Sequence, residues 1–501
     1  MKRQLIFLFT LLTLPLWTVA QSIDLPRSTP AAEGISTQAV INMMDTIMAI
    51  PDCDIHHVVV VRHGKVVAEL HPAPFRAIDS HTLYSASKTF TSLAVGIAID
   101  ENRLRLTDRV AAFFPDKMPD SIAADVASIT VRDMLMMAAG IKPDWPMRDS
   151  SVDWTREWLS KQCNTTPGSL FQYDSMCTFM LAAIVQRVTG RNMKDYLNEK
   201  LFFPMGVYDA EWEMSPDSIA TGGWGLRVTS EVMAKLGVLL CNKGNWNGRQ
   251  LVSADYVEQA CSDQIACGDH SKPKGDGNSG YGYQVWQCKR PGSFRADGAF
   301  GQYSVVVPDK DVVVVIMGMV LYGRPELDCI WNILIPGVKD APLSPEPKLQ
   351  KKLEKLLATA TLELPQGKKN GKKWIGGRLQ LNANEYGLKW IEVLPSGLHF
   401  SRTDGTEEQY AMGYKQWCYS PLNGFPPYSI TAMNRMQDLS RNFAAATAYA
   451  WTSPTTLEVK VHYVNWISGT TFKFDFDKNE VTVCDNYPTS KPETIPFIIV
   501  R

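Results

Sequence analysis

Two valine-rich segments, far apart along the chain, constrain the fold more than any other feature of the sequence. Residues 55–70 read IHHVVVVRHGKVVAEL, two runs of strand-forming residues around a turn at His63, Gly64 and Lys65. Residues 303–318, YSVVVPDKDVVVVIMG, repeat this plan around a turn at residues 308–311. Because each segment predicts a β-hairpin, we expect an antiparallel sheet whose strands come from both ends of a long insertion.

Helical patterns fill the insertion between the two hairpins. The clearest predicted helices are residues 88–101, the segment ITVRDMLMMAAGI ending at Gly140, and the segment MCTFMLAAIVQRVTG ending at Gly190. Each closes on a glycine or a polar turn, as helix ends commonly do. The sequence therefore predicts an α+β fold, in which helices, including a large helical subdomain, flank an antiparallel β-sheet.

The character of the chain changes near residue 340, and 501 residues are more than one compact core usually holds. Residues 341–373 open with prolines and continue as an amphipathic helix. The apolar face of this helix carries Leu349, Leu353, Leu356 and Leu357. Later segments such as LEVKVHYV and TFKFDFD alternate strictly, as half-buried strands do. We predict a main domain over residues 21–340, this linker, and a small C-terminal antiparallel β domain over residues 374–501.

Residues 1–20 have the features of a secretory signal peptide. Lys2 and Arg3 precede an apolar run, and small residues near Ala20 provide a cleavage site. No cysteine stands at the cut, so we expect no lipid anchor, and no later stretch is long enough to predict a membrane span. The 51 Lys+Arg residues nearly balance 52 Asp+Glu, which argues against binding nucleic acid or an anionic membrane. We expect an exported protein, periplasmic or secreted, that acts on a small-molecule or peptide substrate.

The ten cysteines and eight histidines do not form a metal-binding pattern. There is no Cys-x-x-Cys, and the adjacent His56 and His57 would point to opposite faces of a strand. Export permits disulfides, and Cys261 and Cys267, the closest pair, are the predicted bridge. We expect neither a metal ion nor an organic cofactor.

A serine and a lysine three residues apart, Ser85 and Lys88, stand at the start of the predicted helix 88–101. A serine hydroxyl needs a nearby base to act as a nucleophile, and residues three apart on a helix lie side by side. A helix N-terminus and burial both disfavour the charged form of a lysine. The same spacing occurs at Ser271 and Lys274 in a predicted loop. The spacing alone therefore leaves two interpretations, an activated nucleophile or a polar turn that caps a core helix.

Five blocks of sequence decide between these interpretations. They are LYSASKTFTSLAVGIAIDENRLRLTDRVAAFFPD, ITVRDMLMMAAGI, PGSLFQYDSMCTFMLAAIVQRVTG, GGWGLRVTSEVMAKLG and FRADGAFGQYSVVVPDKDVVVV. In this order, they resemble the serine β-lactamase and penicillin-binding-protein superfamily on its class C and esterase side, over about residues 30–335. The resemblance implies a β-lactamase/transpeptidase-like fold, with Ser85 as nucleophile and Lys88 as its base.

The resemblance also implies a second proton-transfer group. Family members carry Tyr-x-Asn or a variant in the third block, where this chain has Tyr173, Asp174 and Ser175. Tyr173 then shuttles a proton between Ser85 and the leaving group, and Ser175 replaces an asparagine that contacts substrate. Aromatic residues near the blocks are candidates for lining a substrate cleft: Trp145, Phe171, Trp224 and Trp286.

The last block departs from the family pattern. The family's Lys-Thr-Gly or His-x-Gly falls on the triplet Ala-Asp-Gly, so Ala296 stands where a cationic or imidazole side chain is expected. Arg295 is adjacent, but alternation along a strand points its side chain to the opposite face. Gly298 remains as a substrate-binding position beside Ala296. The backbone N–H groups of Ser85 and Ala299 can still form an oxyanion hole.

We therefore expect a serine hydrolase that cleaves an amide or ester through a covalent acyl-enzyme on Ser85, with Lys88 and Tyr173 transferring protons. The missing cation counts against substrates whose carboxylate it would hold, such as β-lactams and D-Ala-D-Ala peptides. The last block is more similar to that of aminohexanoate-dimer hydrolases and related esterases. Two alternatives stay open: a penicillin-binding D-Ala-D-Ala peptidase or β-lactamase, and a non-catalytic binding protein on the same scaffold.

Overall fold

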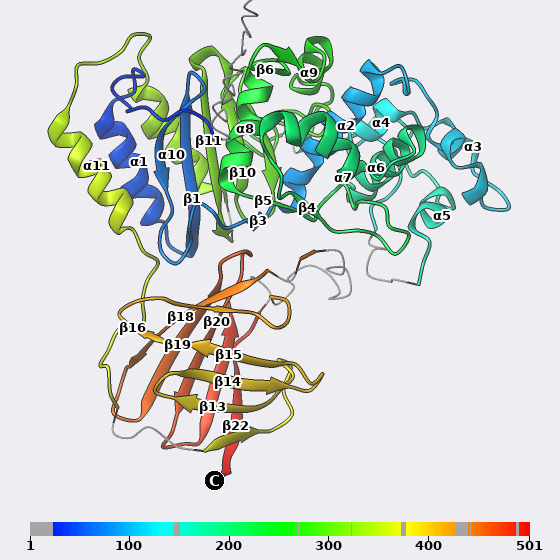
Figure 1. The fold of residues 1–501 in the computed structure, drawn as a ribbon. Coiled ribbons are helices and arrows are strands. Elements are labelled where there is room, and N and C mark those ends of the chain that lie inside the picture. Colours follow the sequence, from blue (N-terminus) through cyan, green and yellow to red (C-terminus); the bar gives the residue numbers. More distant parts are fainter. Residues whose placement is uncertain are drawn as a thin grey trace, which may run out of the picture.

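The structure is a computed structural model in which two β-sheets organise the chain (Figure 1). It describes residues 24–144, 151–268, 271–321, 323–371, 377–426, 439–440, 442–486 and 490–500. The predicted signal peptide and Trp145 lie outside the described residues.

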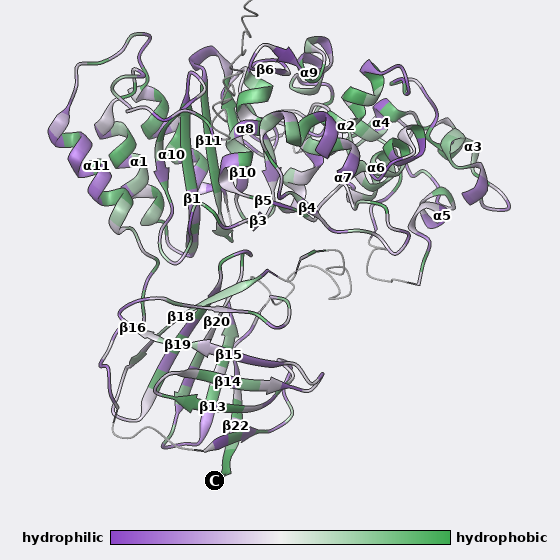
Figure 2. Cartoon of the chain, viewed as in Figure 1, coloured by the Kyte–Doolittle hydropathy of each residue, from purple (hydrophilic) through white to green (hydrophobic). Residues whose placement is uncertain are grey.

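The two predicted hairpins meet in one antiparallel sheet of six strands, in the order β2-β1-β11-β10-β9-β8. Its strands are β1 (Cys53–Arg62), β2 (Lys65–Leu70), β8 (Trp286–Gln287), β9 (Phe294–Gly298), β10 (Gln302–Val307) and β11 (Val312–Val320). Strand β1 pairs directly with β11, so segments from both ends of the insertion lie side by side. Alternate valines of β1 belong to two different hydrophobic cores, one on each face, which explains its unbroken apolar run. Figure 2 shows these central strands as largely hydrophobic.

Helices cover both faces of this sheet (Figure 1). One face packs against α1 (Thr37–Met48), α10 (Pro325–Cys329), the π-helix η8 (Ile330–Leu334) and α11 (Pro347–Thr359). The other face packs against α8 (Ser230–Cys241) and, beyond it, the helical region. The predicted α+β fold is confirmed.

In the helical region, α2 (Ser87–Asp100) and α6 (Ser175–Thr189) lie side by side and are almost wholly buried. Shorter helices surround this pair: α3 (Ala124–Ser128), α4 (Val131–Leu135), α5 (Trp154–Leu159), α7 (Met193–Leu197) and α9 (Ala254–Ala260). The remaining helical turns are η1 (Tyr84–Ala86), η2 (Val110–Phe113), η3 (Pro115–Lys117), η5 (Asn198–Phe202), η6 (Phe203–Met205), η7 (Pro308–Lys310) and η9 (Ile335–Gly337). Short strands complete it: β3 (His81–Thr82), β4 (Glu211–Trp212), β5 (Leu226–Val228), β6 (Asn245–Trp246) and β7 (Arg249–Gln250). The helices predicted over residues 88–101 and up to Gly190 are therefore confirmed.

The helix predicted to end at Gly140 is wrong in extent. Helix α4 stops at Leu135, and Met137 then adopts a left-handed backbone with φ of 57°. Beyond this point the carbonyls of Met137 and Ala138 accept hydrogen bonds of 2.7 Å from the N–H groups of Gln172 and Gly168. These long-range bonds replace the helical ones and fix the segment that leads to Tyr173.

The C-terminal part forms an eleven-stranded sheet that curls into a near-barrel (Figure 1). Its strands are β12 (Arg378–Leu381), β13 (Leu388–Leu394), β14 (Gly397–Arg402), β15 (Glu407–Ala411), β16 (Gly413–Tyr414), β17 (Cys418–Pro421), β18 (Ala444–Trp451), β19 (Thr456–Tyr463), β20 (Gly469–Asp475), β21 (Glu480–Asp485) and β22 (Glu493–Val500). All pairs are antiparallel except β16 with β18, and the sheet is larger than the small β unit predicted.

The predicted bridge between Cys261 and Cys267 is wrong, because all ten cysteines are free thiols. Cys261 instead lies near Cys241 at the ends of helices α9 and α8. The two large cores are apolar and extensive, so the fold does not depend on disulfides.

The leucine face of α11 yields the first testable prediction. Leu353 is 1% exposed against α1 and the sheet, whereas Leu349 is half-buried. We expect Leu353→Ala to lower the free energy of unfolding by about 2–5 kcal/mol, because it leaves a cavity in the core. Leu349→Ala should cost clearly less. Urea unfolding followed by tryptophan fluorescence measures both, and equal losses would contradict the packing described here.

Candidate active site

Ser85 lies where strand β3 turns through η1 into helix α2. The turn is held to strand β5 by the Leu83 N–H, which donates to the Leu226 carbonyl at 2.9 Å. Tyr84 has φ of 47°, a left-handed conformation that costs a residue with a side chain about 1–3 kcal/mol. This tight turn leaves the Ser85 side chain half-buried at the N-terminus of the helix.

The amine of Lys88 lies beside the Ser85 hydroxyl, one helical turn away. Its Nζ donates to Ser85 Oγ at 3.0 Å, to Ser175 Oγ at 3.0 Å and to the Gly223 carbonyl at 2.6 Å. The side chain is only 2% exposed, and this burial lowers the pKa of Lys88 to about 7, opposed by the nearby Asp174 carboxylate. The amine therefore loses its proton near neutral pH and becomes able to accept one.

Tyr173 reaches the same hydroxyl from a distant part of the chain. Its own hydroxyl hydrogen-bonds the Ser85 side chain, and the Lys88 amine lies 4.9 Å from the centre of its ring. Phe171 and Trp286 pack against that ring at centroid distances of 6.3 and 5.7 Å. Burial raises the pKa of Tyr173 above its usual value, so the phenol stays protonated at neutral pH.

The end of strand β9 lies directly against the turn that carries Ser85. A Cβ at Gly298 would lie 2.2 Å from the Leu83 carbonyl oxygen and 3.1 Å from the Ala86 nitrogen. Only glycine permits this approach. The close contact brings the backbone of Ala299 beside the segment of Ser85, the two positions predicted for the oxyanion hole.

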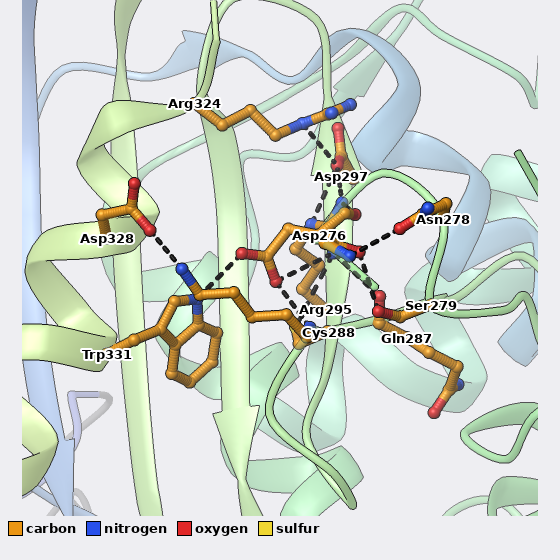
Figure 3. Close-up of polar contacts among 12 residues, drawn as sticks. Asp276, Asn278, Ser279, Gln287, Cys288, Arg295, Asp297, Arg324, Asp328 and Trp331 are labelled. Carbon is orange, nitrogen blue, oxygen red and sulfur yellow. Dashed lines mark hydrogen bonds and ion pairs between the residues drawn. The ribbon is translucent and has the colours of Figure 1, made fainter. Parts of the chain in front are cut away.

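The charged residues of the last block form ion pairs on the face of strand β9 opposite to Ala296, the position of the missing cation. Ala296 is fully buried on the α2 side of the sheet, whereas Arg295 turns to the α1 and α10 side, as alternation predicted. Figure 3 shows the Arg295 guanidinium among Asp276 and Asp297. Its Nε donates to Asp297 at 2.9 Å, and Arg324 lies 3.7 Å from the same carboxylate. Two arginines and two aspartates make this cluster neutral, and Arg295 is not available to a substrate.

The remaining predicted residues fall in different surroundings. Ser175 joins the site through its bond to Lys88. Trp224 directly follows Gly223, but its ring is 8% exposed and packs 6.0 Å from that of Trp154. Trp224 therefore packs in the core next to the Gly223 carbonyl that accepts from Lys88, and its contact with substrate stays a prediction.

Two functional groups of the site were missed by sequence reasoning. The Gly223 carbonyl accepts from Lys88, and a Cβ at this glycine would lie 2.8 Å from the Ser175 carbonyl oxygen. Asp174 caps helix α6 by accepting a hydrogen bond from the Met176 N–H at 2.9 Å. Its carboxylate also acts on the Lys88 amine by raising the pKa of that amine. An aspartate directly before a helix is a recognisable capping signal, but the role of a backbone carbonyl leaves no trace in the sequence.

Neither a metal-binding cluster nor a membrane span is found in the part of the chain that the structure describes. Among the described residues, no cluster of three or more histidine, cysteine, aspartate or glutamate side chains is arranged to hold a metal ion. None of their helices combines the length and apolar character needed to cross a membrane.

Comparison with known proteins relates this site to a family. The family model described as Beta-lactamase matches residues 46–334. A 6-aminohexanoate-dimer hydrolase of Paenarthrobacter ureafaciens is 26% identical over 277 residues, 51% of this chain and 70% of that protein. The flp protein of Staphylococcus aureus strain COL is 29% identical over 133 residues, 25% of this chain and 26% of that protein.

A solved structure from Bacteroides dorei, provisionally described as a beta-lactamase, has the same fold. Its TM-score is 0.50 at 18% identity, and the match covers 65% of this chain and 99% of the other. The predicted β-lactamase/transpeptidase-like fold is confirmed for the first part of the chain.

The electrostatic contact between Asp174 and Lys88 predicts a shift in the pH dependence of activity. In the wild type, kcat/KM should rise as the pH passes about 7, because Lys88 loses its proton there. Burial raises the pKa of Asp174 to about 6, so this carboxylate is charged on that limb and favours the ammonium form. Asp174→Asn keeps a capping oxygen but removes the charge, so the limb should move to lower pH.

A matched control is Asp153→Asn, which changes the capping residue of α5 in the same way. This variant should leave the limb in place. Measurement of kcat/KM for an ester from pH 5 to 9 compares the three proteins. A limb that stays or moves to higher pH in Asp174→Asn contradicts the electrostatic contact.

Proposed function

Because the chain belongs to the beta-lactamase family and is a serine hydrolase, we propose that it cleaves an ester or amide through a covalent acyl-enzyme on Ser85. One observation carries the proposal: the Ser85 hydroxyl is hydrogen-bonded to both the Lys88 amine and the Tyr173 hydroxyl. A hydroxyl between a buried amine and a buried phenol has a proton acceptor and a proton donor in place before substrate arrives.

Acylation follows from the opposite pKa shifts of these two groups. Neutral Lys88 takes the proton of Ser85 as Oγ bonds to the substrate carbonyl carbon. Tyr173, whose pKa is raised, gives its proton to the leaving oxygen or nitrogen as the bond from that atom to the carbonyl carbon breaks. The proton now on Lys88 restores Tyr173. Water then bonds to the carbonyl carbon of the acyl-enzyme and gives one proton to Lys88. The bond from that carbon to Ser85 Oγ breaks, Tyr173 returns a proton to Oγ, and the proton on Lys88 restores Tyr173.

The N–H groups of Ser85 and Ala299 are proposed to stabilise the oxyanion of each tetrahedral intermediate. The close contact at Gly298 supports this role, since it brings the two backbone segments together. Such donors act best when they are fixed before the reaction.

The substrate is proposed to be an ester or amide without a carboxylate next to the scissile bond. The neutral cluster around Arg295 and the apolar Ala296 offer no unpaired cation for such a group. The relative named 6-aminohexanoate-dimer hydrolase supports a linear amide as one candidate substrate class. Phe171 and Trp286, both half-buried beside Tyr173, are proposed to line an apolar acyl or leaving-group site.

Export and domain organisation complete the proposal. The charged, apolar and small-residue pattern of residues 1–20 supports a signal peptide and a periplasmic or secreted protein. The division into residues 21–340, 341–373 and 374–501 is supported by the start of the second sheet at β12 (Arg378–Leu381). Small-molecule or peptide substrates are the proposed partners.

Replacement of the nucleophile tests the proposed chemistry. Ser85→Ala should lower kcat for p-nitrophenyl butyrate by at least about 1,000-fold, because no covalent intermediate can form. Thermal unfolding should stay nearly unchanged. Ser271→Ala, in the second Ser-x-x-Lys match on an exposed loop, is the control and should keep wild-type activity. Near wild-type turnover by Ser85→Ala rules the proposal out.

A substrate panel tests the role given to the last block. We expect kcat/KM for p-nitrophenyl butyrate to exceed that for nitrocefin and for a D-Ala-D-Ala peptide by at least about 100-fold. The physical reason is that the carboxylates of the two other substrates meet no free cation at Ala296. Faster turnover of nitrocefin or the peptide would instead favour the β-lactamase or peptidase alternative.

A further inference from the structure

The C-terminal sheet touches the segment that carries the nucleophile. The contact is made by the turn between β19 and β20, residues 464–468. Asn465 Nδ2 donates to the Ser80 carbonyl at 3.2 Å, and His81 hydrogen-bonds the backbone of Trp466. The turn is therefore fixed, by two polar contacts, to the strand that leads into η1. Figure 1 shows the C-terminal sheet on the side of the catalytic part where β3 and β5 lie.

An aromatic contact extends this attachment to both sides of the proposed oxyanion hole. The Trp466 ring lies 6.3 Å from the ring of Tyr84, and the Tyr84 ring lies 5.4 Å from that of Phe300 in an edge-to-face arrangement. Tyr84 directly precedes Ser85, and Phe300 directly follows Ala299. Tyr84 and Trp466 are 4% and 1% exposed and belong to the hydrophobic core of the C-terminal sheet, against which Ala299 and Phe300 also pack.

The two residues joined by this contact have left-handed backbones. Tyr84 has φ of 47° and Phe300 has φ of 66°. Bulky residues rarely adopt this conformation, and they hold it only where surrounding contacts fix it. The β9–β10 turn is held from the sheet side by Gln302, whose Nε2 donates to the Phe300 carbonyl at 3.1 Å and to that of Gly318 at 2.7 Å. On its other side, the Phe300 ring packs edge-to-face against the Tyr84 ring, which in turn lies beside the ring of Trp466.

From this geometry we propose that Trp466, in the C-terminal sheet, is a positioning residue that holds the two backbone N–H donors of the active site in place through Tyr84 and Phe300. Trp466 acts through these rings and does not touch the reacting atoms. The C-terminal sheet is then a part of the catalytic machinery, and its loss disorders the oxyanion hole even when the catalytic side chains remain. The inference rests on the proposed function of Ser85.

The test compares full-length variants at position 466 with a control at another contact between the two sheets. Trp466→Ala removes the ring, and Trp466→Phe keeps an aromatic ring. The control Tyr419→Phe removes a different contact, in which the Tyr419 hydroxyl donates to the Pro74 carbonyl at 2.7 Å. Functional sites are counted by fluorophosphonate labelling and intact mass, and kcat and KM are measured for p-nitrophenyl butyrate.

We expect Trp466→Ala to lower kcat per labelled site by about 10- to 100-fold, with KM within about twofold of the wild type. Displaced N–H donors weaken the stabilisation of the transition state, whereas they contribute little to binding of the substrate in its ground state. Trp466→Phe should recover kcat to within about threefold of the wild type, and Tyr419→Phe should keep it. Wild-type kcat per labelled site in Trp466→Ala, even with a lower melting temperature, overturns the proposal, because that is the result of a purely structural role.

Two further outcomes are separated by the same measurements. If Trp466→Ala does not fold, Trp466→Leu fills the apolar space without a ring, and wild-type kcat in that variant overturns the proposal. A wild-type protein that is labelled, but not on Ser85, overturns the proposed function instead. Labelling on Ser85 together with the kcat loss at position 466 supports both.

Discussion

The buried amine of Lys88 is the interaction on which the rest of the site depends. Burial of an ammonium group costs several kcal/mol unless its donors are paired, and here its three bonds go to Ser85, Ser175 and the Gly223 carbonyl. These acceptors come from three separate segments, so the folding of helices α2 and α6 against each other assembles the site. The same burial lowers the pKa of the amine to about 7. The desolvation that disfavours the ammonium group in the folded protein therefore also makes the amine able to accept a proton near neutral pH.

The last block shows how a site of this kind can be built without a second cationic side chain beside Lys88. Gly298 contributes no side chain, and the contact that it permits aligns the backbone near Ala299 with that of Ser85. The charges nearby are neutralised in pairs around Arg295, on the far face of strand β9. In the proposed mechanism, transition-state stabilisation is then left to backbone N–H groups, which suits substrates that carry no charged recognition group.

Sequence reasoning predicted the parts of this molecule that depend on local patterns. The two hairpins and helices α2 and α6 could be predicted from periodicity and caps, whereas the convergence of Tyr173 with Ser85 was implied by the family resemblance alone. The early end of α4 could not, because it depends on bonds from Met137 to a segment 35 residues further on. The Gly223 carbonyl and the contact of Trp466 with Tyr84 also escaped prediction, since a backbone acceptor and a tertiary contact between distant segments leave no local signal.

The strained turns beside Ser85 give the C-terminal sheet a physical role next to a site to which it contributes no catalytic side chain. A left-handed backbone at Tyr84 and at Phe300 costs about 1–3 kcal/mol each, and an aromatic pair returns about 0.5–1.5 kcal/mol beyond its burial. The pair between Tyr84 and Phe300 therefore does not offset the strain by itself. Trp466 adds a second ring contact from the hydrophobic core that Tyr84 shares with the C-terminal sheet, so in the proposed mechanism the geometry of the oxyanion hole depends on contacts from both sheets.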